Sequence, residues 1–172
     1  MGSIKAFYEA NMESKRSTNM GYNYFDTESP MYTMPRCLPP TRVTDVVITD
    51  SVIGEGCLLN RCRIIGSVLG HRTRIKDGAV VEDSVIMGSD IYQEDLDRRN
   101  TQGMQTTVPI GIGEGSFIRK AIIDKNARIG KRVMIINKDN VEEGSREADG
   151  YCTNEGIVIV LKGAIIPDDT IL

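Results

Sequence analysis

The sequence predicts a mainly β protein, a parallel β-helix of the hexapeptide-repeat type, on three observations. A seven-residue pattern with apolar first, sixth and seventh positions recurs as IGEGCLL, IKDGAVV, IGEGSFI, IGKRVMI and IPDDTIL. The related pieces DSVIG, GSVLG and DSVIMG begin 16 and 17 residues apart, and the repeats at Ile112 and Ile129 are also 17 apart. The chain has abundant Ile and Val but only three Phe, six Tyr and no Trp, which suits a thin core of stacked aliphatic side chains.

Three short strands separated by corners make one β-helix coil of roughly 17 or 18 residues. Strands of neighbouring coils stack about 4.8 Å apart, so inward Ile, Val and Leu form ladders along the axis. Glycines at positions 54, 70, 113 and 130 suit the tight corners between faces. An amphipathic helix is disfavoured over these repeats, because their apolar residues do not follow the i, i+3, i+4, i+7 spacing.

The coils are expected over residues 43–172, after an N-terminal part of residues 1–42. Within that part, residues 2–13 predict a short helix with Ile4, Phe7, Tyr8 and Met12 on one face. The proline-containing remainder, 14–42, predicts an extended linker. Polar stretches at 89–108 and 137–155 interrupt the repeat, and they predict loop insertions extruded from the coil.

Composition excludes several classes of protein. A net charge of −3 with both signs mixed argues against a nucleic-acid or acidic-membrane surface. No apolar run approaches the roughly 18 residues of a transmembrane helix, so no membrane partner is expected. The start MGSIKAFYEANMESKR matches neither a signal peptide, a transit peptide nor a myristoylation signal, so no targeting segment is expected in this chain. The four cysteines form no CxxC pair and predict reduced, packed thiols.

No catalytic or metal site emerges from the residues. Some β-helix enzymes use three histidines around a metal, but this chain has only His71, and no metal site is expected. His71 could act as the lone general base of an acyltransferase, although a solvated corner residue is the simpler interpretation. The acidic stretch NKDNVEEGSREADG lacks the calcium-loop spacing, and GIGEG lies in a repeat rather than between a strand and a helix.

Two lysines do stand out. Lys125 and Lys162 each lie four residues before a repeat isoleucine, in KNARI and KGAII, and are 37 positions apart. That step equals one 17-residue coil plus about 20 residues, which the insertion at 137–155 can absorb. The two lysines are therefore predicted to stack on neighbouring coils.

Two ammonium groups stacked about 5 Å apart repel each other by roughly 1–3 kcal/mol, depending on the effective dielectric. A phosphate or sulfate bound between them relieves that repulsion. Arg128, Arg119 and Lys120 are near in sequence and are expected to add positive potential. The alternative is that both lysines point into solvent beside acids such as Asp124 and Asp168.

Longer motifs resemble a known family. AIIDKNARIGKRVMIINKDNVEEGSREADGY, VPIGIGEGSFIRKAIIDKNARIG, DSVIGEGC and YTMPRCLPPTRV are similar to the C-terminal region of ADP-glucose pyrophosphorylase (glucose-1-phosphate adenylyltransferase) of the plant and cyanobacterial type. The resemblance covers nearly the whole chain. It implies a left-handed parallel β-helix that lies after the nucleotidyltransferase domain of an enzyme converting ATP and glucose 1-phosphate to ADP-glucose and pyrophosphate in starch or glycogen synthesis.

The resemblance also implies partners and a site. It implies contacts with the catalytic domain and with other subunits of a tetramer, and binding of 3-phosphoglycerate as activator and phosphate as inhibitor. Lys125 and Lys162 match the family's activator-site lysines, and we place Asp124 and Arg128 in the same effector site. The family's catalytic residues, and with them ATP and Mg²⁺, belong to the catalytic domain, so no cofactor and no activity are expected of this chain alone. The family's regulatory disulfide cysteine likewise lies outside it.

Three functions therefore stay open from the sequence. The first is a regulatory and oligomerisation domain of the pyrophosphorylase, in the plastid stroma of a plant or the cytoplasm of a bacterium. The others are a free-standing acyltransferase trimer that uses His71 and a purely structural scaffold. The sequence does not distinguish a small from a large subunit type.

Overall fold

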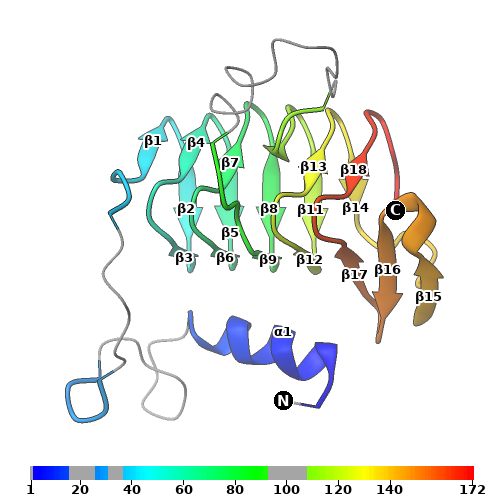
Figure 1. Ribbon diagram of the computed structural model, residues 1–172, viewed down its shortest axis with the longest axis horizontal. Helices are drawn as coiled ribbons and strands as arrows, with labels where there is room; N and C mark the ends of the chain where they lie inside the picture. Colours follow the sequence, from blue (N-terminus) through cyan, green and yellow to red (C-terminus); the bar gives the residue numbers. More distant parts are fainter. Residues whose placement is uncertain (1, 16–25, 31–36, 93–107) are drawn as a thin grey trace.

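The computed structural model describes residues 2–15, 26–30, 37–92 and 108–172, and these form a parallel β-helix with three faces and one N-terminal helix. In Figure 1 the strands follow one another along the long axis of the molecule, and the helix α1 runs beside them. Most of the predicted linker 14–42 lies outside the described residues, as do residues 93–107 of the first insertion. In the described part of the chain, no helix has the length and apolar character needed to cross a bilayer.

Three sheets, named here A, B and C, form the walls of the β-helix. Sheet A contains β1 (Arg42–Thr44), β4 (Leu58–Asn60), β7 (Arg74–Ile75), β10 (Gly111–Ile112), β13 (Arg128–Ile129) and β18 (Ile165–Ile166). Sheet B contains β2 (Val47–Thr49), β5 (Arg63–Ile65), β8 (Val80–Glu82), β11 (Phe117–Arg119) and β14 (Met134–Ile135). Sheet C contains β3 (Val52–Ile53), β6 (Val68–Leu69), β9 (Val85–Ile86), β12 (Ala121–Ile123), β17 (Ile157–Val160), β16 (Tyr151–Asn154) and β15 (Glu143–Arg146).

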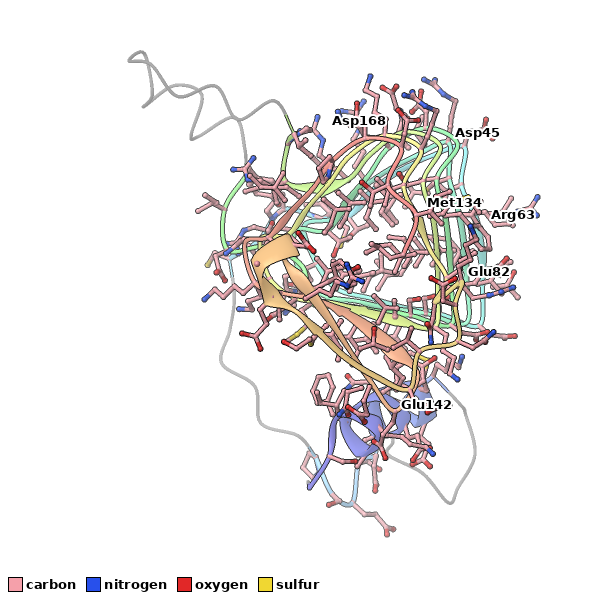
Figure 2. All side chains as sticks on the ribbon, turned by 90° about the vertical axis from the view of Figure 1, so that its right-hand side faces the viewer. Asp45, Arg63, Glu82, Met134, Glu142 and Asp168 are labelled. Atoms are coloured by element: carbon pink, nitrogen blue, oxygen red, sulfur yellow. The ribbon has the colours of Figure 1, made fainter. Side chains whose placement is uncertain are left out.

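The core consists of the three predicted aliphatic ladders, one for each wall. Parallel pairing places the inward residue of each strand directly above that of the next coil, for example Ile75 on Ile112 and Ile112 on Ile129. Ile64, Ile118, Ile129 and Ile135 are completely buried. Figure 2, which looks along the molecule, shows side chains filling the space between the walls, whereas the labelled Arg63, Glu82 and Met134 lie along one wall.

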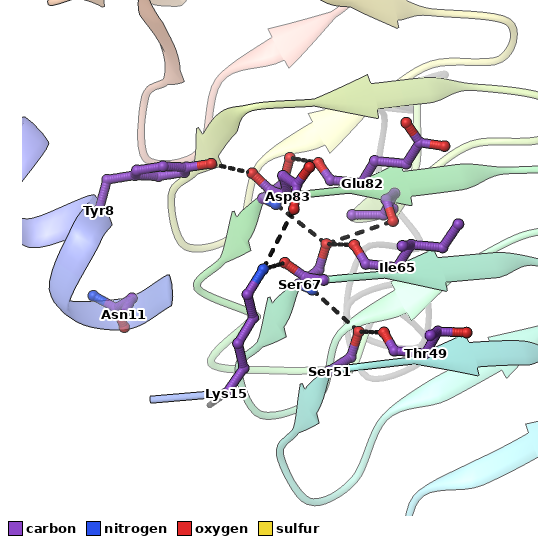
Figure 3. Close-up of polar contacts among 12 residues, drawn as sticks. Tyr8, Asn11, Lys15, Thr49, Ser51, Ile65, Ser67, Glu82 and Asp83 are labelled. Carbon is purple, nitrogen blue, oxygen red and sulfur yellow. Dashed lines mark hydrogen bonds and ion pairs between the residues drawn. The ribbon is translucent and has the colours of Figure 1, made fainter. Parts of the chain in front are cut away.

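A ladder of serines closes the corner between sheets B and C. The hydroxyl groups of Ser51, Ser67 and Ser84 each donate to a carbonyl two residues earlier, at 2.8, 2.8 and 2.6 Å. Each hydroxyl oxygen also accepts from an amide of the next coil, at 3.1–3.2 Å, and Ala121 is the last of these donors. Figure 3 shows the hydroxyl–carbonyl bonds of this ladder. The DSV and GSV pieces of the sequence thus supply a small polar side chain that bonds both its own coil and the next.

The helix α1 (Ile4–Glu13) confirms the predicted N-terminal helix, and Ser3 caps it by accepting from the amide of Ala6 at 3.2 Å. Its apolar side chains Phe7, Tyr8 and Met12 pack on the outer face of sheet C. They meet a cluster of outward aliphatic residues: Val85, Ile122, Ile157 and Ile159. The helix therefore covers an apolar patch on the outer face of this sheet.

Polar contacts from Tyr8 and Lys15 attach the N-terminal part to the corners after β5 and β8. The Tyr8 hydroxyl donates to the carbonyl of Asp83, and Lys15 Nζ lies 2.7 Å from the carbonyl oxygen of Gly66 and 3.3 Å from Asp83 Oδ1 (Figure 3). Burial, with a smaller contribution from the Asp83 charge, raises the pKa of Tyr8 to about 12. The phenol is therefore held in its neutral, donating form.

The segment 137–155, predicted as a loop insertion, contains an antiparallel β-hairpin. Strands β15 and β16, joined by a 3₁₀ turn at Glu147–Asp149, pair with each other, and β16 pairs antiparallel with β17. The hairpin thereby extends sheet C, which otherwise contains parallel pairs. It is inserted between β14 and β17, so it lengthens that coil without displacing the strands that follow.

Candidate functional site

The two lysines lie on the corner where each coil passes from sheet C to sheet A, which we call the lysine edge. Backbone hydrogen bonds link successive coils along this edge. At one end the amide of Arg72 donates to the Glu55 carbonyl at 3.0 Å, and at the other the amide of Gly163 donates to the Lys125 carbonyl at 2.9 Å. The residues at the equivalent position of successive coils are Glu55, His71, Gly88, Lys125 and Lys162. Lys125 and Lys162 are therefore immediate neighbours.

The strands on both sides of the lysines are in the same register. Ile123 pairs with Val160 before the corner, and Arg128 pairs with Ile165 after it, so both pairs keep the 37-residue spacing. The inserted hairpin accounts for the excess over one coil. The stacking predicted from the sequence is confirmed at the level of the backbone.

A carboxylate from the preceding coil faces Lys125. Asp90 Oδ1 lies 3.0 Å from Lys125 Nζ, and both side chains are about half exposed, at 48% and 45%. Asn126 holds the same carboxyl group, because its Nδ2 donates to Asp90 Oδ2 at 2.9 Å and its Oδ1 accepts from the Asp90 amide at 2.9 Å. Asp90 thus contacts Lys125 and Asn126, the two residues that follow Asp124.

Electrostatics at the lysine edge favour negative charge. The hydrogen bonds from Asn126 and Lys125 lower the pKa of Asp90, and the charges of Lys125 and Lys162 lower it further. Asp90 is therefore held in its charged form beside Lys125.

The other two predicted site residues have local structural roles. Asp124 Oδ1 accepts from the backbone amide of Lys125 at 2.6 Å, so this carboxylate stabilises the turn. Arg128 lies on sheet A, and its Nη1 donates to the carbonyl of Val108 at 2.8 Å. The structure places Asp124 at the lysine edge and Arg128 beside it on the next strand.

The expectation that Arg119 and Lys120 add to the same potential was wrong. Arg119 ends β11 on sheet B, and Lys120 forms the corner between sheets B and C. The strand β12 separates Lys120 from Lys125, so the two side chains lie on opposite edges of sheet C. Closeness in sequence misled here because a β-helix turns a corner about every six residues.

His71 has a structural contact that the sequence did not predict. Its Nδ1 accepts from the amide of Glu55 on the preceding coil at 3.2 Å. Among the described residues, no group of three or more His, Cys, Asp and Glu side chains could hold a metal ion. The four cysteines are all described and free, with Cys57 and Cys62 buried, Cys152 half-buried and Cys37 exposed.

Sequence reasoning missed Asp90 and Asn126. Asp90 opens an insertion and lies 35 positions before Lys125, so no repeat alignment connects the two. Asn126 could have been identified as a corner residue, because asparagine tolerates the left-handed backbone conformation. It adopts that conformation here, with φ 62°.

Comparison with known proteins agrees with this architecture. Residues 36–171 match the model of the GLGC left-handed parallel beta-helix domain. The chain is 58% identical over 171 residues to the Arabidopsis thaliana protein called inactive glucose-1-phosphate adenylyltransferase small subunit 2, chloroplastic, covering 99% of this chain and 35% of that relative. It is 48% identical over 172 residues to the Triticum aestivum glucose-1-phosphate adenylyltransferase small subunit, chloroplastic/amyloplastic, covering 100% of this chain and 36% of that relative.

The chain thus spans about a third of the length of these relatives, both of which are named as small subunits. The family model covers every strand from β1 to β18, the whole of the lysine edge included. The resemblance that the sequence motifs indicated is therefore confirmed, and the chain belongs to the family of GLGC left-handed parallel β-helix domains.

Proposed function

We propose that this β-helix is a regulatory and assembly domain of a glucose-1-phosphate adenylyltransferase, and that its lysine edge binds a phosphate-containing effector. The observation that carries the proposal is the position of Lys125 and Lys162 at the same corner of consecutive coils. Phosphate oxygens accept several charge-assisted hydrogen bonds at once, which suits two neighbouring ammonium groups. The proposed ligands are 3-phosphoglycerate and inorganic phosphate.

The proposal assigns no catalysis to this chain. Among the described contacts, Lys125 pairs with Asp90, and Asp90 also accepts from Asn126, so these contacts give the side chains an electrostatic and a structural role. We propose that nucleotidyl transfer, with its ATP and Mg²⁺, belongs to the part of the relatives' length that this chain does not span. The lysine edge then acts on that activity through the effector that it binds.

Assembly with further subunits forms the second part of the proposal. The first coil exposes inward-ladder residues at its open end, with Val43 at 50% and Ile48 at 39% relative exposure. The neighbouring Val47 is 56% exposed. Covering such apolar side chains by another subunit is favourable by roughly 25 cal/mol per Å² of apolar area. We further propose a plastid location, which the names of both relatives support.

Phosphate titration of the 172-residue chain by calorimetry at low ionic strength tests the effector site. Lys125→Ala and Lys162→Ala are each expected to weaken binding roughly tenfold or more, because each removes a charge-assisted hydrogen bond. Lys131→Ala is the matched control, since Lys131 lies 3.1 Å from Glu114 and is 47% exposed, closely similar to Lys125 with Asp90. Equal affinity in all three variants contradicts the assignment.

A further inference from the structure

One acidic side chain already takes up hydrogen-bonding capacity that an anion needs. In the coil before Lys125, the equivalent corner residue is Gly88, which has no side chain. The carboxylate of Asp90, two residues later, reaches the edge in its place and lies 3.0 Å from Lys125 Nζ. Asp90 therefore makes the contact that a phosphate oxygen would make.

The carboxylate is held at this position. Asn126 donates to one of its oxygens and accepts from its backbone amide, both at 2.9 Å. Asn126 is itself fixed in a tight corner, where its backbone N–H donates to the Gly88 carbonyl at 3.1 Å. Moving the Asp90 carboxylate away from Lys125 therefore breaks its contacts with Asn126, which involve neither lysine.

We infer that Asp90 is an internal competitor for the anion site formed by Lys125 and Lys162, and that it lowers the affinity of that site for phosphate groups. The inference rests on the proposed function. An incoming anion must share Lys125 with the Asp90 carboxylate and approach its negative charge. The role of Asp90 is to set the effector concentration at which the site responds.

The variant Asp90→Asn removes the charge and keeps an oxygen that can accept from Asn126. Because an exposed ion pair is worth up to about 1 kcal/mol, the Kd for inorganic phosphate is expected to fall roughly two- to fivefold. Asp90→Ser, which has a shorter side chain, is expected to shift the Kd in the same direction. Agreement between the two variants separates the loss of charge from any local rearrangement.

Glu114→Gln is the matched control, because it changes the net charge of the chain equally. Glu114 lies 3.1 Å from Lys131 at the corner between sheets A and B, with side-chain exposures of 50% and 47%, against 48% and 45% for Asp90 and Lys125. This control is expected to bind phosphate as the parent chain does. Any gain that it shares with Asp90→Asn comes from net charge alone.

The outcomes separate this inference from the proposed function. If the parent chain binds phosphate and Lys125→Ala does not, an Asp90→Asn affinity equal to that of Glu114→Gln overturns only the role of Asp90. If neither the parent chain nor Asp90→Asn binds phosphate, both proposals fail. Binding that is tighter in Asp90→Asn, or detectable only there, supports both.

Discussion

Lys162 follows Lys125 by one coil of the β-helix, and the amide of Gly163 donates a 2.9 Å hydrogen bond to the carbonyl of Lys125. The two residues are 37 positions apart, more than twice the length of an uninterrupted coil. Their adjacency depends on a hairpin that leaves the coil and returns to it in register. Every function proposed for the lysine edge depends on this relationship.

The inward ladders are expected to dominate stability. Ile129→Ala removes a completely buried side chain from the ladder on sheet A, between Ile112 and Ile166, and a loss of about 2–5 kcal/mol in the free energy of unfolding is expected. Ile165→Ala is the control on the adjacent strand, where the side chain is 44% exposed, and about 1 kcal/mol or less is expected. Urea denaturation measures both, and similar losses would contradict the inward and outward assignment.

The serine ladder is expected to contribute through its hydrogen bonds rather than through its volume. Ser84→Ala leaves the buried amide of Ala121 without its acceptor, and a loss of about 1–3 kcal/mol is expected. Ser51→Ala changes the same side chain in the first coil, where the position is only half-buried, so a smaller loss is expected. Equal losses at both positions would show that burial of the acceptor does not matter.

The attachment of α1 is expected to weaken at alkaline pH. The folded-state pKa of Tyr8 is about 12, above its ordinary value of 10.0, because burial and then the Asp83 charge disfavour the phenolate. A raised pKa of an acid means that its stabilising contribution is complete below pH 10 and is lost as the pH rises through about 12.

Tyr8→Phe removes this titration. Near neutral pH the parent chain is expected to be more stable than Tyr8→Phe by about 0.5–1.5 kcal/mol, because the variant lacks the hydrogen bond to the Asp83 carbonyl. Between pH 10 and 12 the difference is expected to shrink. Denaturation curves of both chains across this range test the prediction, and a difference that is independent of pH would contradict it.

The cysteines are expected to differ widely in reactivity. Burial raises the pKa of the Cys62 thiol to about 11 and also raises that of Cys57, and the thiolate is the reactive form. Cys37 is exposed, so Cys37→Ser is expected to remove the fast phase of labelling by a thiol reagent. The two buried thiols should react only after unfolding. Fast labelling of Cys57 in the folded chain would contradict the packing described for the first coils.

The repeat predicted the fold well because each inward position recurs in every coil. The 17-residue step defined the aliphatic ladders, and the 37-residue step placed Lys162 beside Lys125. The repeats did not reveal which corner each one spans: IGEGCLL leads from sheet C to sheet A, whereas IKDGAVV leads from sheet A to sheet B. Both have the same apolar spacing because all three walls require it.

Contacts outside the repeat could not be predicted. In the hairpin within 137–155, β15 is polar and largely exposed, whereas β16 is half-buried to buried. Neither strand shows a clear alternation of apolar and polar residues, and the pairing depends on β17 as a partner. The contact between Asp90 and Lys125 forms at corners where both Gly88 and Asn126 adopt a positive φ. Both conditions come from the three-dimensional corner and not from a motif.

The most direct test of the shared anion site follows both lysines in one phosphate titration. In the 172-residue chain, the side-chain Nζ resonances of Lys125 and Lys162, assigned by Lys→Arg variants, are monitored by NMR as phosphate is added. A single anion held by both lysines predicts that the two resonances shift together with the same Kd, while Lys131 stays unchanged. Two different Kd values, or a response at only one of the two, would contradict a common site.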